Sequence, residues 1–141
     1  MDERAAIRAR LLRSRNGAAV WAERFRTAET PDRDLFRLCL RGYVLEKYML
    51  TERDAAECGS FDALVERSIA KSMQISAELV SELESAQSCG GATSSETKKV
   101  LLFLAVQRDF SLELPAEKTP YIRTLDDLAD LAWEAMQKNK N

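Results

Sequence analysis

The sequence predicts an all-α protein, and three observations carry that prediction. Only 5 Gly and 3 Pro occur among 141 residues, which is too few for a loop-rich chain. β-Branched residues show little of the alternation with polar residues that is typical of strands. Apolar residues recur instead at spacings of three and four, which indicates helices with one apolar face.

The first predicted helix spans residues 3–15, where a narrow apolar stripe lies among five arginines. Asn16-Gly17 is a helix-ending pair of the C-cap type, so we expect this helix to stop there. A second short helix is then expected over residues 18–27.

A third helix is expected to start at Thr30 as its N-cap, with Pro31 in the first position, where its missing N–H costs nothing. Apolar side chains cover more than one face of this helix, which predicts that it lies inside the protein. These side chains are Leu35, Phe36, Leu38, Leu40, Tyr43, Val44, Leu45 and Tyr48. Thr51 is expected to begin a short fourth helix that ends at Cys58-Gly59.

Ser60 is the predicted N-cap of the next helix, whose apolar stripe has helical spacing. The stripe consists of Phe61, Leu64, Val65, Ile69 and Met73. Residues 81–95 are polar and small, and Gly90-Gly91 would cost about 1 kcal/mol each inside a helix. We therefore do not expect this stretch to be helical throughout.

Two more helices are expected near the C-terminus. Residues 96–110 read as a strongly apolar helix, and Pro115 and Pro120 bracket a connector. Thr124 with Asp127 forms a pattern like a capping box, with Asp in place of Glu, and predicts the start of the last helix. The apolar residues of that helix are Leu125, Leu128, Leu131, Ala132 and Met136.

The composition argues against a conventional enzyme. The chain has no histidine, which removes the usual general base and the commonest metal ligand. Cys39, Cys58 and Cys89 are widely spaced and form no CxxC pair, so we interpret them as reduced, incidental thiols rather than a metal site. We expect no catalytic and no metal-binding residues, because no pair of carboxylates has a spacing that assigns roles.

The sequence predicts a cytoplasmic protein whose charge is unevenly distributed along the chain. No apolar run approaches the length of a membrane span, and the N-terminus carries charge where a secretory signal would be apolar. Residues 1–48 contain 11 Lys and Arg against 7 Asp and Glu, whereas residues 49–141 contain 10 against 16. The basic first helix is read as a solvated face or as a site for an acidic partner, and the net charge of −2 argues against nucleic acid.

Several short motifs in residues 60–136 occur in a recognisable order. Gly91 to Ser95 reads Gly-Ala-Thr-Ser-Ser, residues 110–115 read Phe-Ser-Leu-Glu-Leu-Pro, and residues 122–125 read Ile-Arg-Thr-Leu. With the amphipathic helix before them and the helix after them, they resemble the acyl carrier protein family over about 77 residues. The resemblance implies an acyl-carrier-like four-helix bundle at residues 59–137, with a helical N-terminal extension at 1–58 and a polar tail at 138–141.

In this family one serine at the start of the second helix carries 4′-phosphopantetheine, and the loaded arm is presented to partner enzymes. The resemblance places that serine at Ser94, with Ser95 as the second candidate. The chain departs from the family pattern at Thr93, which replaces the usual Asp, and at Ser95, which replaces the usual Leu. The alternative is that these hydroxyl side chains only cap the helix and that no arm is attached.

Residues 99–110 and 120–124 also resemble the divergent carrier-related proteins of bacterial peptide-maturation clusters. Two functions are therefore expected. The first is a non-enzymatic carrier or adaptor for biosynthetic or peptide-modifying enzymes; the second is a carrier fold without an arm that serves as a protein-interaction scaffold. In ordinary carriers the second helix is acidic, but here it contains Lys98, Lys99 and Arg108, which would weaken steering toward a basic partner.

The apolar run in residues 101–106 wraps nearly the whole circumference of its helix. A small carrier buries only one side of this helix, so the other side needs a cover. Either the N-terminal extension supplies it, through residues including Phe36 and Tyr43, or the face is a partner or self-association site.

Overall fold

The computed structural model describes residues 3–83 and 95–139, and these contain no β-strand. The all-α class is confirmed. The described helices are α1 (Glu3–Arg26), α2 (Arg33–Lys47), α3 (Glu52–Glu57), α4 (Phe61–Leu83), α5 (Ser95–Phe110), the short 3₁₀ helix η2 (Thr119–Tyr121) and α6 (Leu125–Asn139).

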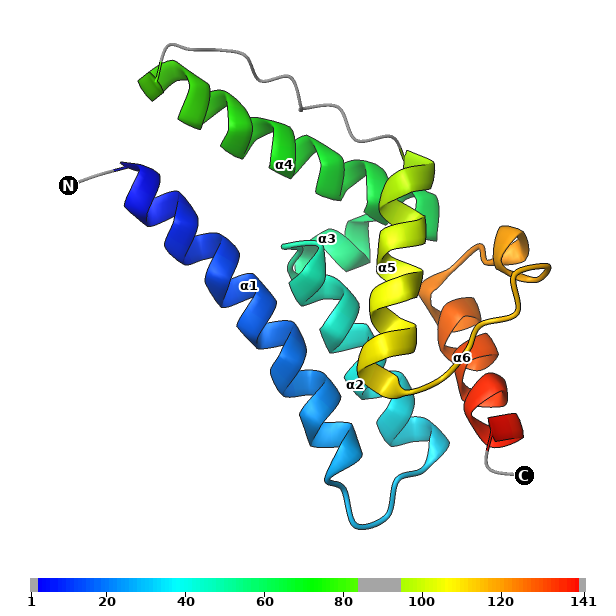
Figure 1. Cartoon of the computed structure of the whole chain (residues 1–141). Coiled ribbons are helices and arrows are strands. Elements are labelled where there is room, and N and C mark those ends of the chain that lie inside the picture. Colours follow the sequence, from blue (N-terminus) through cyan, green and yellow to red (C-terminus); the bar gives the residue numbers. More distant parts are fainter. Residues whose placement is uncertain (1–2, 84–94, 140–141) are drawn as a thin grey trace.

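Helix α2 occupies the middle of the arrangement. It lies antiparallel beside α1, to which a short loop connects it, and α5 passes over it (Figure 1). Helix α6 packs against the other side of α2, and α4 crosses the end of the bundle near the start of α5 (Figure 1). The expectation that this helix lies inside the protein is confirmed, because six of its side chains are buried.

The predicted helix end at Asn16-Gly17 is wrong, since α1 continues without a break through both residues. The glycine serves a different purpose there: a Cβ added at Gly17 would lie 2.5 Å from Oε2 of Glu46 on α2. Ala18 and Ala22 follow on the same side of α1 and are also buried. Packing against α2 therefore keeps α1 helical across a sequence that would end an isolated helix.

Gly42 provides the same close approach from the α2 side. A Cβ at this position would lie 2.2 Å from the Trp21 ring on α1. We predict that Gly42→Ala lowers the free energy of unfolding by about 1–3 kcal/mol, because the indole ring must shift. Urea unfolding measures the change, and Gly59→Ala is the control, since nothing lies within 4 Å of its added Cβ. Equal effects at the two positions would contradict the close approach.

The predicted start of the third helix at Thr30-Pro31 is also wrong. Helix α2 begins at Arg33, and Asp32 is its N-cap. The Asp32 carboxylate accepts a hydrogen bond from the backbone N–H of Leu35 at 2.8 Å. Asp is as good an N-cap as Thr or better, and it stands three residues before the donor that it satisfies.

The separate helix predicted over residues 18–27 is likewise part of α1, which ends at Arg26. The three helix starts predicted from N-caps at Thr51, Ser60 and Thr124 are confirmed. Thr51 and Asp54 form a capping box at the start of α3, which ends at Cys58. The Ser60 hydroxyl accepts from the backbone N–H of Ala63 at 3.1 Å at the start of α4. Thr124 and Asp127 cap α6 reciprocally, with both contacts at 3.1 Å.

One cluster of buried side chains joins the two predicted parts of the chain. Phe36 of α2 packs edge-on against Phe25 of α1 and Phe110 of α5, with ring centroids 5.1 and 5.4 Å apart, and lies 5.7 Å from Trp133 of α6. Four helices thus meet at one side chain with no exposed surface. The division into an extension at 1–58 and a carrier-like part at 59–137 stays a prediction, but their side chains share this core.

Within the described residues, no helix has the length and apolarity needed to cross a membrane.

Candidate functional site

The start of α5 is the part of the structure nearest to the predicted modification site. Ser95 is the first residue of this helix and is half-buried. Ser94, Thr93 and Cys89 lie outside the described residues, so the assignment of an arm to Ser94 stays a prediction. Helix α5 itself begins one residue before the start that the sequence predicted.

Two adjacent lysines near this end of α5 have opposite environments. The Lys99 ammonium pairs with the Asp62 carboxylate of α4 and lies 3.7 Å from Glu96. The hydrogen bond with Asp62 raises the pKa of Lys99. Lys98 instead lies over the Tyr48 ring, with its Nζ 5.4 Å from the ring centroid, and burial lowers its pKa.

The far end of α5 is tied to the first two helices. The Tyr43 hydroxyl of α2 donates a hydrogen bond to Oδ2 of Asp109 at 2.5 Å, and Arg26 of α1 donates to the Asp109 carbonyl at 2.8 Å. Arg108 pairs with the same carboxylate at 2.9 Å. The hydrogen bonds from Arg108 and Tyr43 lower the pKa of Asp109, although burial opposes them.

These contacts change how the charge of α5 is interpreted. Two of the three cations noted in the sequence, Lys99 and Arg108, are paired with carboxylates of the chain itself. The charge reversal expected from the sequence is therefore largely neutralised on α5. Much of the solvent-facing surface of α5 is formed by apolar side chains instead.

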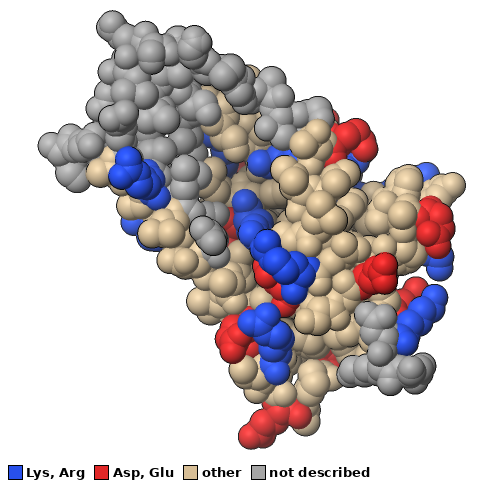
Figure 2. All heavy atoms as spheres, in the orientation of Figure 1, with Lys and Arg blue, Asp and Glu red and all other residues tan. Residues whose placement is uncertain are grey.

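Helix α5 has one covered and one open apolar face. Leu102, Val106 and Phe110 are buried against the rest of the protein. Three other side chains expose about half of their surface: Val100 by 51%, Leu101 by 58% and Leu104 by 54%. We call these three residues the α5 face; Figure 2 shows a largely uncharged strip over this helix. Phe25, Phe36 and Tyr43 of the N-terminal part pack against Phe110 on the covered side, where Phe61 of α4 also stacks on Phe103 of α5. The other side stays open in the described structure.

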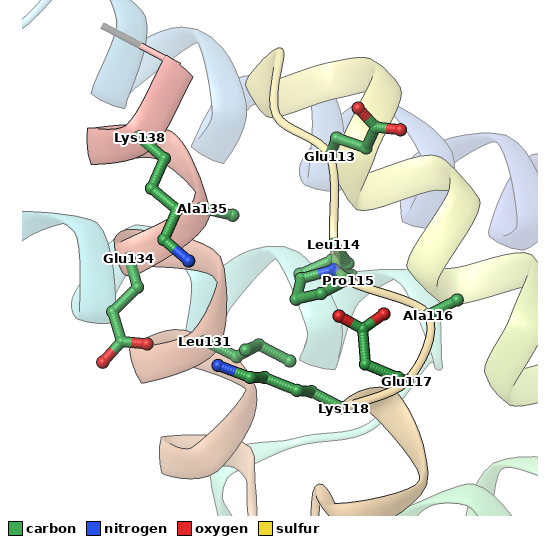
Figure 3. Close-up of a pocket in the computed structure, with 10 residues that line it drawn as sticks. All are labelled: Glu113, Leu114, Pro115, Ala116, Glu117, Lys118, Leu131, Glu134, Ala135 and Lys138. Atoms are coloured by element: carbon green, nitrogen blue, oxygen red, sulfur yellow. The ribbon is translucent and has the colours of Figure 1, made fainter. Parts of the chain in front are cut away.

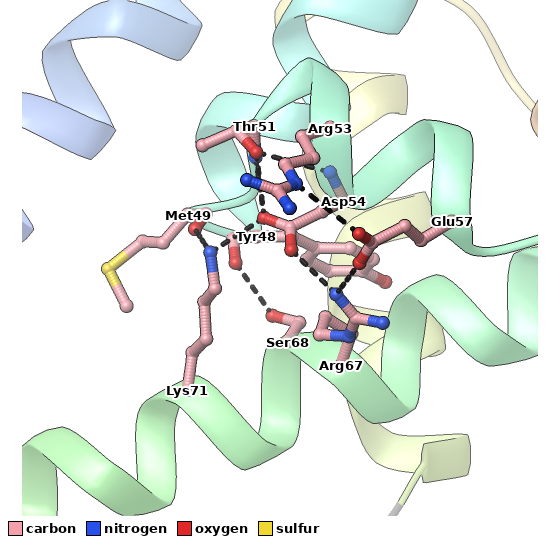
Figure 4. Close-up of polar contacts among 9 residues, drawn as sticks. All are labelled: Tyr48, Met49, Thr51, Arg53, Asp54, Glu57, Arg67, Ser68 and Lys71. Carbon is pink, nitrogen blue, oxygen red and sulfur yellow. Dashed lines mark hydrogen bonds and ion pairs between the residues drawn. The ribbon is translucent and has the colours of Figure 1, made fainter.

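A cluster of polar residues fastens α3 to α4 (Figure 4). The buried Asp54 carboxylate accepts hydrogen bonds from Lys71 at 2.7 Å and Arg67 at 2.8 Å, both on α4. The backbone N–H of Thr51 donates to it at 2.8 Å. These donors, with Lys71 contributing most, hold the pKa of Asp54 well below its usual range.

We predict that Asp54→Asn lowers the free energy of unfolding by about 2 kcal/mol at pH 7, because the Lys71 ammonium and the Arg67 guanidinium lose a charged acceptor. The folded-state pKa lies below the unfolded one, so the stabilisation is complete above about pH 4 and disappears as the pH falls further. The difference between the wild type and the variant should therefore shrink below that pH. Glu57→Gln is the control: this carboxylate contacts Arg67 at 3.0 Å but is 48% exposed, and its loss should cost below about 1 kcal/mol. A pH-independent difference would contradict the role of the charge.

A half-open hollow of about 380 Å³ lies between the connector after α5 and the outer side of α6 (Figure 3). Leu114, Pro115 and Leu131 form its apolar floor, and the Lys118 side chain extends beside Leu131. The connector is held in place because Gln107 accepts a hydrogen bond from the Leu114 N–H at 2.7 Å. The hollow could receive an apolar side chain, but its mixed charges single out no ligand.

No groups of three or more His, Cys, Asp or Glu in the described part of the chain are placed to hold a metal ion. Cys39 is buried, which raises the pKa of its thiol, and Cys58 is half-buried. The raised pKa keeps the Cys39 thiol from the reactive thiolate form.

Sequence reasoning did not find the Asp54 cluster, the α6 hollow or the environment of Lys98. The pattern Thr51-x-x-Asp54 was a visible signal for the first, since it is a capping box. Lys98 and Tyr48 are 50 positions apart, and no local pattern joins them.

Comparisons of the chain with protein-family models, with curated protein sequences and with solved structures found no match. The described residues place the chain in the class of all-α proteins, with six α-helices. Any assignment of function therefore has to come from the geometry of these helices.

Proposed function

We propose that this chain is a non-enzymatic, acyl-carrier-like protein that presents α5 to the enzymes of a bacterial biosynthetic pathway. The observation that carries the proposal is the α5 face. Val100, Leu101 and Leu104 lie together on one side of a helix whose opposite side is buried, and each exposes about half of its surface. A group of large exposed apolar side chains on an ordered helix is typical of an interaction surface.

The order of elements supports the carrier-like part of the proposal. Helix α4 is followed by a stretch of eleven residues outside the described structure, and α5 begins directly after Ser94. A connector with the short η2 then leads to a capped α6. This is the order that the resemblance implies, and it would place the modified serine at the start of α5.

The proposal has a form with a prosthetic arm and a form without one. In the first, Ser94 carries 4′-phosphopantetheine and presents an acyl chain to its partners. In the second, the chain is an adaptor for peptide-modifying enzymes and has no arm. The pairing of Lys99 and Arg108 within the chain favours the second, because α5 offers apolar contacts rather than the charged surface by which carriers are steered.

Intact mass spectrometry separates the two forms. The chain would be co-expressed with a broad-specificity phosphopantetheinyl transferase, and protein from the native host would be measured in parallel. The carrier form predicts a mass increase of one phosphopantetheine that is lost in Ser94→Ala and retained in Ser95→Ala. No increase in either sample would overturn the carrier form and leave the adaptor form.

A further inference from the structure

Lys98 is an amine in an unusual place for a lysine near the protein surface. Its Nζ lies over the Tyr48 ring, and it forms no ion pair with any described carboxylate. The adjacent Lys99 takes the two nearby carboxylates, Asp62 from α4 and Glu96 from α5. An ammonium that is half-buried without a carboxylate loses hydration and gains only the weaker attraction of an aromatic face.

The ring under Lys98 belongs to a row of aromatic side chains. The ring centroids of Tyr48 and Phe61 are 6.4 Å apart, and those of Phe61 and Phe103 are 6.0 Å apart in a stacked arrangement. Only 3% of the Tyr48 surface is exposed. Its side chain therefore meets Lys98 in surroundings that favour a neutral group over a charged one.

The Tyr48 hydroxyl supplies a second and independent observation. In the described residues it is the buried side-chain polar atom that has no hydrogen-bond partner. A buried hydroxyl without an acceptor is costly and unusual. The hydroxyl thus lacks an acceptor, and the side chain that lies over its ring is that of Lys98.

We propose that Lys98 is an acyl-acceptor site, whose ε-amine takes an acyl group from an activated donor, a thioester or an acyl phosphate. The neutral amine attacks the donor carbonyl, a C–N bond forms and the C–S or C–O bond to the leaving group breaks. The thiolate or phosphate leaves with the electron pair of that bond, and the amine proton passes to solvent. The product is a neutral amide that removes the charge from the aromatic row and brings a carbonyl acceptor to the region of the Tyr48 hydroxyl.

Burial lowers the pKa of Lys98, whereas pairing with Asp62 raises the pKa of Lys99. Near neutral pH, a larger share of Lys98 than of Lys99 is therefore in the reactive neutral amine form. The two residues are adjacent on one helix, so the chain contains its own matched control. The exposed Lys138 near the end of α6 provides a second reference. The inference does not depend on a prosthetic arm, because the donor is added from outside.

The test treats the full-length chain with acetyl phosphate in one arm and acetyl coenzyme A in the other, and follows each lysine by peptide mass spectrometry. We expect Lys98 to be acetylated about fivefold or more faster than Lys99 and Lys138 near pH 7.5, with the advantage shrinking at pH 10, where ordinary lysines also lose their proton. Comparing the two arms shows which class of donor is used. Lys98 reacting no faster than both references in either arm would overturn the proposal.

Tyr48→Phe tests the acceptor part, because it keeps the ring and removes the hydroxyl. Acetylation should raise the melting temperature of the wild type and should not raise that of Tyr48→Phe, while the rate at Lys98 stays within about twofold. The same rise in both proteins would contradict a role for the hydroxyl in holding the amide. Lys98→Arg should remove the fast-reacting site while keeping the positive charge, and persistence of the fast adduct in that variant would overturn the assignment.

Discussion

Removal of residues 1–50 is expected to leave a chain that does not fold cooperatively. The deletion removes α2, whose Phe36, Cys39, Leu40, Tyr43, Val44 and Leu45 are all buried. Burying one large apolar side chain contributes about 1.5–3 kcal/mol, so the burial lost with this set is as large as the net stability of an ordinary domain, about 5–15 kcal/mol. The remaining segment should aggregate or dimerise through the surfaces that α2 now covers.

Circular dichroism during heating and sedimentation of the 51–141 fragment would measure this outcome. A chain that ends at residue 139 is the control, because it keeps every described helix at full length and should melt like the intact protein. A 51–141 fragment that is monomeric and melts cooperatively would show that the carrier-like part has a core of its own. That result would contradict the shared core.

The second large effect is expected from Phe36→Ala. Phe36 touches Phe25, Phe110 and Trp133, and therefore joins α1, α5 and α6 to α2. We expect the free energy of unfolding to fall by about 3–5 kcal/mol, because the ring has no exposed surface and the four helices cannot all move in to fill the space.

Leu38→Ala on the same helix is the matched control for Phe36→Ala. Leu38 is 47% exposed, so its truncation should cost about 0.5 kcal/mol. Denaturant unfolding of the two variants measures the difference. Similar costs at the two positions would mean that the aromatic cluster does not hold the helices together.

The helix starts that the sequence predicted correctly depend on neighbouring residues. Thr51, Ser60 and Thr124 each cap a helix through an N–H three residues ahead, so a short pattern contains the full interaction. The predicted stop at Gly17 failed for the opposite reason. Its glycine fits against Glu46, which is 29 positions away in the chain, and no local pattern records that contact.

The features of the candidate site also divide into local ones, which the sequence predicted, and long-range ones, which it did not. The apolar character of residues 101–106 was visible in the sequence, and the structure places part of it in the core and part on the α5 face. Which side would be covered depended on how α2 packs, which periodicity cannot reveal. The neutralisation of Lys99 by Asp62 joins two helices and was likewise invisible, and the Ser94 assignment lies outside the described residues.

Site-specific photo-crosslinking tests the central claim, that α5 is the surface presented to partner enzymes. A photoreactive amino acid would replace Leu104 on the α5 face in one protein and Leu38 of α2 in another, since these leucines are exposed by 54% and 47%. Both proteins would be irradiated in the native host and their adducts identified by mass spectrometry. The α5 face predicts a defined enzyme adduct at Leu104 that is absent at Leu38 and is lost when Leu101→Glu is added. Adducts that are the same at both positions, or none at Leu104, would contradict the claim.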